Sequence, residues 1–477
     1  MIRSSSVYAL GSVVKLVAAL VRGKTVAVLG GPLAVGQYGL LLPLLNSAVT
    51  LANLGVPFAG VREVAAAAGN EDGGASVART CTVVRRVTLA GSMVVSAAVV
   101  LASGWISRVI FDDGVPAWAV AVVGVGIVLE SINNSRTSIL NGMRKPGLML
   151  ALSLIRNGLG AIVVALAVAI DGVRGLAWGI LGMTVCGAVG GLLLERRAAP
   201  RSVTMAVSEI VASSRGLFGL GLTVCLSSSL TMVGALVLRS LIAGDIGVDR
   251  LALYLAAASL SSLAFDFLFG VVAKDFLPRV SAAAGDPSAV QAVVDRFMLF
   301  LVWLTVPIVV LGVCFSELLL QLAYSHEFVP AAGILVGCVA GNVFKVPALL
   351  LTSVLIAEGQ TRRYAVLQAV GVVARVVVVY GVVRGFGLAY AGAAELALNA
   401  ALLLGTAAAS FGAIPVRLSQ SVVLAGGILL AAAAASVSVF MTSDPLTWPR
   451  WLAVPVALAC GGKLLVEFRR ETPDGSA

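Results

Sequence analysis

Two similar stretches, VREVAAAAGN (Val61–Asn70) and LPRVSAAAGD (Leu277–Asp286), lie 216 residues apart in the chain. Further matches follow in the same order at nearly the same spacing, and such self-similarity indicates an internal repeat. These matches pair Tyr38 with Tyr254, NGMRK (Asn141–Lys145) with EGQTRR (Glu358–Arg363), and GLAWG (Gly175–Gly179) with GLAYA (Gly387–Ala391). The sequence therefore predicts two related halves.

The composition is that of a membrane protein. Of 477 residues, 59% are hydrophobic and only 12% are charged, with a mean hydropathy of +1.04. A soluble protein carries roughly 25% charged residues, so a soluble enzyme and a nucleic-acid-binding domain are excluded. The six cysteines show no metal-binding spacing, and the single histidine, His326, excludes a Cys/His zinc site. We expect no metal and no cofactor.

Apolar segments between charged or Gly/Pro-rich breaks predict an all-α protein with fourteen transmembrane helices. A membrane span needs about 20 mostly apolar residues. The predicted spans lie near 7–29, 33–58, 81–103, 116–141, 148–170, 173–194, 215–242, 249–271, 297–315, 329–357, 364–383, 386–410, 418–440 and 447–466. Each repeat contains six of them, an even number, so both copies enter the membrane from the same side. This parallel repeat predicts an N-terminal six-helix lobe (1–200), a C-terminal six-helix lobe (201–412), and an appended pair of helices with a tail (413–477).

The distribution of lysine and arginine predicts the orientation. The termini and even-numbered loops hold twenty of these residues and the odd-numbered loops hold five. Cytoplasmic loops carry the excess of positive charge, so both termini are expected in the cytoplasm and the protein in the cytoplasmic membrane. Tryptophans are expected near the outer interface, as in an aromatic belt; they are Trp105, Trp118, Trp178, Trp448 and Trp451.

Ionisable residues inside the predicted spans are mostly positive. Each central arginine or lysine costs about 2.5–3.5 kcal/mol on insertion scales, so these residues are candidates for function. The basic residues are Lys15, Arg22, Lys24, Arg136, Arg156, Arg239, Lys345 and Arg375, and the acids are Glu130, Asp266 and Glu395. Some bases can reach headgroups by snorkelling, and others can form ion pairs that fix helix packing. Since three acids do not neutralise eight bases, some positive charge is expected to face water or an anionic ligand.

The polar stretch ESINNSRTS (Glu130–Ser138) falls within one predicted span, which indicates a helix lining a cavity or a hydrogen-bonded seam between helices. A cationic cavity predicts an anionic substrate, because guanidinium and ammonium groups recognise phosphate and carboxylate. The predicted substrate site comprises Lys15, Arg22, Lys24, Asn133, Arg136, Arg156, Lys345 and Arg375. Glu130, Asp266 and Glu395 are expected either to couple ions or, as the more economical interpretation, to form structural ion pairs.

Nucleotide binding is not expected. Gly23-Lys24-Thr25 has the end of a phosphate-binding loop, but that motif needs a glycine where Ala18 stands. The basic residues Lys15, Arg22 and Lys24 also interrupt the first apolar run, so we predict a retained first helix and no cleaved signal peptide.

The segment GSVVKLVAALVRGKTVAVLGGP (Gly11–Pro32), together with Gln37-Tyr38-Gly39, resembles the first helix of Wzx-type polysaccharide flippases of the multidrug/oligosaccharidyl-lipid/polysaccharide exporter superfamily. FLPRVS (Phe276–Ser281) and ILNGMRK (Ile139–Lys145) are similar to two of their loop segments. The resemblance implies a transporter, with no catalytic activity, that moves an undecaprenyl-pyrophosphate-linked oligosaccharide to the outer leaflet for O-antigen, capsule or exopolysaccharide (cell-surface polysaccharide) synthesis. It also implies contact with membrane lipids and with the polymerase and chain-length machinery.

Other functions stay open. Fourteen helices are also found in the lipid II flippases of the same superfamily, whereas many Wzx proteins have twelve. A multidrug or cation antiporter is disfavoured because the first predicted helix carries bases where that branch carries an acid. A membrane glycosyltransferase is disfavoured by the short outer loops.

Overall fold

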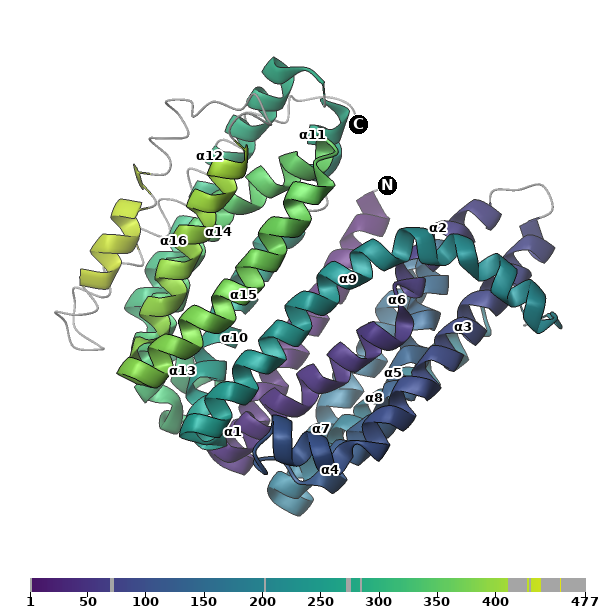
Figure 1. Cartoon of the computed structure of the whole chain (residues 1–477), viewed down its shortest axis with the longest axis horizontal. Coiled ribbons are helices and arrows are strands. Elements are labelled where there is room, and N and C mark those ends of the chain that lie inside the picture. Colours follow the sequence, from purple (N-terminus) through teal and green to yellow (C-terminus); the bar gives the residue numbers. More distant parts are fainter. Residues whose placement is uncertain are drawn as a thin grey trace. The chain divides into compact units, whose positions relative to one another are not determined.

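The computed structural model describes residues 2–68, 73–200, 203–271, 276–283 and 285–410, together with 427–428, 430–438 and 455. Helices account for nearly all of these residues, and the described part contains no strand (Figure 1). The chain divides into two compact units, Met1–Ala252 and Leu253–Ala477. The all-helical prediction is confirmed.

The first unit is built from long helices and short connecting turns (Figure 1). Its elements are α1 (Ile2–Asn53), α2 (Val56–Ala68), α3 (Gly73–Leu101), α4 (Ser103–Trp105), η1 (Ile106–Ile110), α5 (Ala117–Gly142), α6 (Pro146–Ser153), η2 (Leu154–Leu159), α7 (Gly160–Asp171), η3 (Gly172–Arg174), α8 (Gly175–Glu195) and α9 (Val207–Ile246). Here η1 and η2 are π-helices and η3 is a 3₁₀-helix.

The second unit has the same character. Its elements are α10 (Val248–Val271, whose first residues belong to the first unit), α11 (Leu277–Ala282), α12 (Pro287–Cys314), α13 (Ser316–Ala323), η5 (His326–Ala331), α14 (Ala332–Ala357), α15 (Thr361–Phe386), η6 (Leu388–Tyr390) and α16 (Ala391–Ser410). α14 packs closely on α16, because Gly337 lies against the backbone of Gly392 and any side chain there would collide with it. Small residues let helix backbones approach in this way.

α1 covers two of the predicted spans and bends between them. Gly31 has φ 67° and ψ −167° inside the helix, a conformation that glycine adopts without steric cost. Pro32 follows directly, and its ring is compatible with the first turn of the next helical segment. The bend therefore divides α1 into a segment that carries Arg22 and a segment that begins at Pro32.

Eight described segments are long and apolar enough to cross a membrane. They support a multi-pass membrane protein, while the count of fourteen helices and the symmetry of the lobes remain predictions. Most of the predicted spans 418–440 and 447–466 lies outside the described residues. α9 packs on α1, α2 and α3 within the first unit. The compact units thus divide at a later residue than the lobe boundary that the repeat predicts, and that boundary also stays a prediction.

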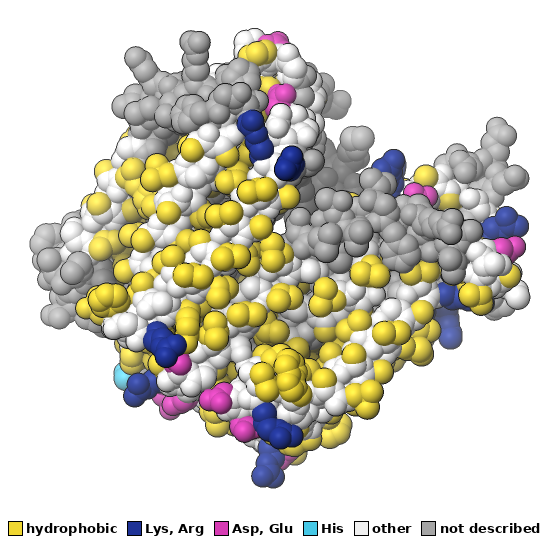
Figure 2. Space-filling view, viewed as in Figure 1, with side chains coloured by type: hydrophobic (Ala, Val, Ile, Leu, Met, Phe, Trp, Pro, Cys, Tyr) yellow, Lys and Arg dark blue, Asp and Glu magenta, His cyan; other side chains and the backbone are white. Residues whose placement is uncertain are grey.

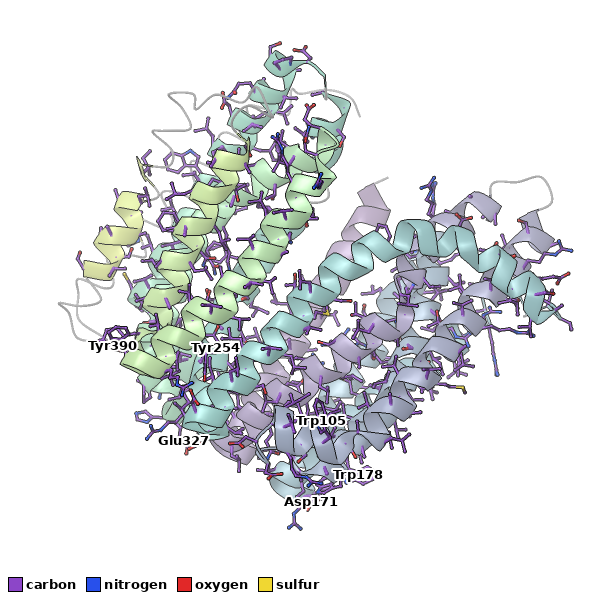
Figure 3. The ribbon with its side chains drawn as sticks, viewed as in Figure 1. Trp105, Asp171, Trp178, Tyr254, Glu327 and Tyr390 are labelled. Carbon is purple, nitrogen blue, oxygen red and sulfur yellow. The ribbon has the colours of Figure 1, made fainter. Side chains whose placement is uncertain are left out.

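Hydrophobic side chains cover the visible helices along most of their length, and charged side chains gather near the helix ends (Figure 2). Trp105, Trp178 and Asp171 lie at the same end of the first unit (Figure 3). Trp118 stacks on Trp178 with ring centroids 6.4 Å apart. This grouping is typical of an aromatic belt at one membrane interface.

Candidate functional site

Arg22 is a buried arginine on α1 in the first unit, with 8% of its surface exposed. Its Nη1 donates one long hydrogen bond, 3.5 Å, to the backbone carbonyl of Asn157. Its Nε has no hydrogen-bond partner, and no described carboxylate forms an ion pair with it. A buried charge is normally paired, so Arg22 has capacity to bind an anion.

The π-helix η2 faces Arg22 and carries Arg156 and Asn157. π-bulges of this kind occur frequently at functional sites. Arg156 pairs with the buried Glu130 of α5, with Nη2–Oε1 at 2.5 Å and Nε–Oε2 at 3.3 Å. Asn133, one turn further along α5, donates to Glu130 Oε1 at 3.5 Å, and its own Oδ1 is buried without a partner. Arg22, Asn133, Arg156 and Asn157 therefore form one polar group with unused donors and an unused acceptor.

A glycine on α8 makes room for this group. A Cβ added at Gly187 would lie 3.2 Å from the Cγ atoms of both Arg156 and Asn133, closer than most side-chain contacts. Gly191, one turn later, lies equally close to Arg136. Because these two glycines have no side chain, Arg156 and Arg136 can pack directly against the backbone of α8.

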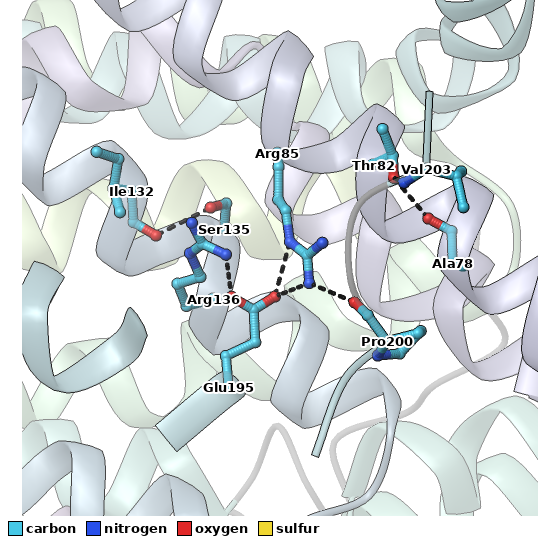
Figure 4. Close-up of polar contacts among 9 residues, drawn as sticks. All are labelled: Ala78, Thr82, Arg85, Ile132, Ser135, Arg136, Glu195, Pro200 and Val203. Atoms are coloured by element: carbon cyan, nitrogen blue, oxygen red, sulfur yellow. Dashed lines mark hydrogen bonds and ion pairs between the residues drawn. The ribbon is translucent and has the colours of Figure 1, made fainter. Parts of the chain in front are cut away.

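Glu195, at the last turn of α8, forms a second cluster in the same unit (Figure 4). It accepts hydrogen bonds from Arg85 of α3 at 2.6 and 2.9 Å and pairs with Arg136 of α5. Arg85 also donates to the carbonyl of Pro200, 3.1 Å away. Because one buried carboxylate joins three helices and the chain that leaves α8, this cluster has a structural role.

The second unit holds a different polar group. Arg375 of α15 donates to Glu395 of α16 over distances of 2.8 to 3.0 Å, and Tyr254 of α10 (labelled in Figure 3) donates to the same carboxylate at 2.8 Å. A narrow polar cavity of about 10 Å³ lies beside this pair. It is lined by Ala258, Ser261, Ser262, Cys338, Asn342, Lys345, Arg375, Glu395 and Asn399. That space suits roughly one water molecule.

Most of the residues predicted from the sequence fall into three groups. Arg22, Asn133 and Arg156 gather around η2 and Glu130, whereas Lys345 lies beside the Arg375–Glu395 pair in the second unit. Arg136 belongs to the Glu195 cluster. Lys15 is exposed and Lys24 is half-buried, and the side chain of Asp266 lies outside the described part. That these residues bind a substrate stays a prediction.

Sequence reasoning missed Glu195, Arg85 and Asn157. Glu195 and Arg85 fall near the ends of predicted spans, where charged residues are usual, so neither drew attention. Asn157 follows Arg156 directly, and polar neighbours in one span are a signal that could have identified it.

Comparison with known proteins adds the following findings. A family model described as "Polysaccharide biosynthesis protein" matches residues 27–333. No curated protein sequence matches the chain.

Solved structures share the fold. The chain is similar to the lipid II flippase MurJ in an inward closed conformation, with a TM-score of 0.70, 11% identity and 99% of each chain covered. It is also similar to an inward-facing multidrug resistance MATE family transporter of the MOP superfamily, with a TM-score of 0.67, 15% identity, and 90% of this chain and 96% of that chain covered. A MOP superfamily transporter from Pyrococcus furiosus gives a TM-score of 0.54 at 15% identity, covering 93% and 96%. At these identities the likeness shows the fold alone.

Proposed function

The chain belongs to the polysaccharide biosynthesis protein family. From this premise, and because the buried Arg22 forms no ion pair with a described carboxylate, we propose that the protein is a flippase for a lipid-linked oligosaccharide. The substrate is an undecaprenyl-pyrophosphate-linked oligosaccharide, carried from the inner to the outer leaflet of the cytoplasmic membrane. The proposal places both termini in the cytoplasm and assigns the protein a transport role without catalysis. The product would pass to the polymerase and chain-length machinery of cell-surface polysaccharide synthesis.

The observation that carries this proposal is the charge balance of the buried groups. The buried carboxylates among the described residues are Glu130, Glu195 and Glu395, and each already holds at least one arginine. A cationic drug would have to displace a guanidinium to reach any of them. An anion, in contrast, finds Arg22 with an open donor. These facts favour an anionic substrate over a multidrug or cation antiporter.

The chemistry of a pyrophosphate head fits this group. Guanidinium nitrogens donate charge-assisted hydrogen bonds to phosphate oxygens. In an alternating-access cycle, Arg22 would hold the head, the glycan would follow in the hydrated cavity, and the polyprenyl tail would stay in lipid. A membrane potential that is negative inside favours outward movement of an anion by about 2.3 kcal/mol per charge per 100 mV.

Binding of undecaprenyl pyrophosphate and of undecaprenol to the detergent-purified full-length protein tests the proposal. We expect the pyrophosphate lipid to bind and undecaprenol not to. Arg22→Gln should weaken pyrophosphate binding about tenfold, the effect of losing one charged hydrogen bond. The control is Arg108→Gln, an exposed arginine of η1 that bonds to Gly104 and should leave binding unchanged. Equal binding of both lipids, or normal binding by Arg22→Gln, would contradict a headgroup site.

A lipid II flippase is the second candidate, favoured by the fold shared with MurJ. The same arginines would serve it, because lipid II also carries a pyrophosphate. Competition between lipid II and an undecaprenyl-pyrophosphate oligosaccharide for the wild-type protein separates the two, since the preferred glycan displaces the other at lower concentration.

A further inference from the structure

A groove lies in the second unit where the first turn of α15 meets the last turn of α16. It has a volume of about 530 Å³ and is lined by Arg362, Arg363, Val366, Leu367, Ala408 and Ala409. The groove is separate from the polar cavity beside Glu395, with which it shares no lining residue. It therefore provides a second place where a ligand can bind.

The polar end of the groove is positive. Arg362 and Arg363 are both exposed, and none of the described residues that line the groove is acidic. Arg363 Nη1 donates to the carbonyl of Ala409 at 3.3 Å, which holds this guanidinium across the groove. The nearest acid along the chain, Glu358, lies in the preceding turn and does not line the groove.

The start of α15 adds to this positive potential. Gln360 makes no side-chain capping bond there, and the first turn contains no acid. A helix N-terminus presents free N–H groups and the positive end of the helix dipole, and both favour an anion such as phosphate. The arginines and the helix end thus point to a ligand with an anionic head.

The remainder of the groove and the helix beyond it are apolar. Val366, Val370, Val373 and Val377 follow one another at spacings of four, three and four residues, so they share one face of α15, and each is exposed by 56% or more. In the most apolar 18-residue stretch of α15, only 11% of the residues are buried, which is the lowest share among the eight candidate spans of the described chain. This face suits acyl chains, which lie along apolar helices in a bilayer.

We propose that this groove is a binding site for an anionic glycerophospholipid of the surrounding membrane. The phosphate would contact Arg362, Arg363 and the start of α15, and an acyl chain would lie along Leu367 and the valine face. Under the orientation predicted from the sequence, the site faces the cytoplasmic leaflet. The inference goes beyond the proposed transport function and does not depend on which substrate is carried.

Native mass spectrometry of the full-length protein tests this, with phosphatidylglycerol as the probe and phosphatidylcholine of the same acyl chains as the comparison, because its zwitterionic head has a phosphate but no net charge. We expect the wild type to retain phosphatidylglycerol at concentrations where phosphatidylcholine is lost. Arg362→Gln/Arg363→Gln should weaken phosphatidylglycerol binding about tenfold, and Arg362→Lys/Arg363→Lys should restore part of it because charge is kept. The matched control is Arg196→Gln/Arg197→Gln, an exposed adjacent pair at the C-terminal end of α8.

The outcomes separate the alternatives. If the control weakens binding as much as the groove variant, the effect is general surface charge and the proposal is wrong. If glycerophosphate without acyl chains competes equally well, the groove is a free-phosphate site. If undecaprenyl pyrophosphate displaces phosphatidylglycerol from the wild type and loses this ability in the groove variant, the groove belongs to the substrate. The free-phosphate result and the substrate result each overturn the assignment to a membrane lipid. An unchanged melting temperature of the lipid-free variants confirms that they fold.

Discussion

The two units pair their arginines in different ways. In the second unit, Arg375 has a carboxylate of its own, and Tyr254 completes the shell of that carboxylate. In the first unit, Arg156 is paired with Glu130, but Arg22 beside it has only one long bond to a backbone carbonyl. Arg375 is therefore paired with its own carboxylate, whereas Arg22 has an unused donor and no ion pair with a described carboxylate. A buried polar group without a partner reduces stability, and such costs are commonly retained where a function needs them.

The largest expected loss of stability comes from breaking the Arg375–Glu395 pair. Arg375→Met would leave the buried Glu395 without its arginine, and leaving a buried charge unpaired by removing its partner costs about 3–5 kcal/mol. Chemical denaturation of the purified protein measures this loss. The double variant Arg375→Met/Glu395→Leu should recover most of the stability, because it removes both charges. A double variant as unstable as the single one would mean that packing, and not charge, dominates at this position.

The second largest effect is expected from filling the space beside Arg156 and Asn133. Gly187→Ala places a methyl group against Arg156 and Asn133, and overpacking costs about 1–3 kcal/mol. We expect pyrophosphate-lipid binding to weaken as well, since the arginine must shift. Gly147→Ala on α6 is the control, because nothing lies within 4 Å of its added Cβ. Normal binding by Gly187→Ala would show that the group around η2 is not the headgroup site.

A change of opposite sign is expected at Arg22. Arg22→Met should raise the free energy of unfolding by about 1 kcal/mol, because it removes a buried charge that has no counter-ion among the described residues, while pyrophosphate-lipid binding should weaken about tenfold, as in Arg22→Gln. Parallel denaturation and binding measurements on this variant and on Arg375→Met test the contrast directly. If Arg22→Met were destabilised like Arg375→Met, the two units would not differ in the way described above.

The smallest expected effect concerns an exposed carboxylate of the second unit. Asp286 caps α12, accepting from the Ser288 and Ala289 N–H groups at 2.9 and 3.3 Å and from the Ser288 hydroxyl at 2.7 Å. The Ser288 hydroxyl first, and the two N–H groups after it, lower the pKa of Asp286 below 3.8. A lowered pKa stabilises the fold fully above 3.8, and this contribution is lost as the pH falls through the folded-state pKa.

Melting temperatures of wild type and Asp286→Ala between pH 3 and pH 7 test this N-cap. The deficit of the variant should be small and constant at neutral pH and should shrink toward pH 3. A deficit that does not change with pH would mean that the charge of the cap contributes nothing.

The sequence predicted the helical membrane fold because that prediction rests on composition, which does not depend on tertiary contacts. It also named Glu130 and Glu395 among the acids expected either to couple ions or to form ion pairs, since a carboxylate inside a span is costly without a partner. The structure places an arginine on each, and a coupling role stays a prediction. The partners themselves could not be deduced. Glu395 lies 20 residues from Arg375, and Glu195 lies 110 residues from Arg85, so only the packing of helices brings them together.

The sequence could not predict which basic residues of a span would be covered by neighbouring helices. Lys15 and Arg22 both lie inside the first predicted span, seven residues apart, yet Lys15 is exposed and Arg22 is buried. Residues seven apart lie on the same face of a helix, so the two side chains differ because neighbouring helices cover α1 unevenly along its length. Hydrophobic periodicity does not resolve this in a helix that is apolar on all sides.

The π-helix at Leu154–Leu159 has a consequence for inheritance. A π-helix contains one residue more than the α-helical turn it replaces, so losing one codon in this segment would leave a continuous α-helix between Pro146 and Asp171. Because only the extra residue is removed, the helical segments before and after it would keep their faces, and the change of direction would fall on side chains inside the segment. A single-codon deletion would thus preserve a membrane helix, and its cost would fall on the side chains of the segment itself, Arg156 and its ion pair with Glu130 among them.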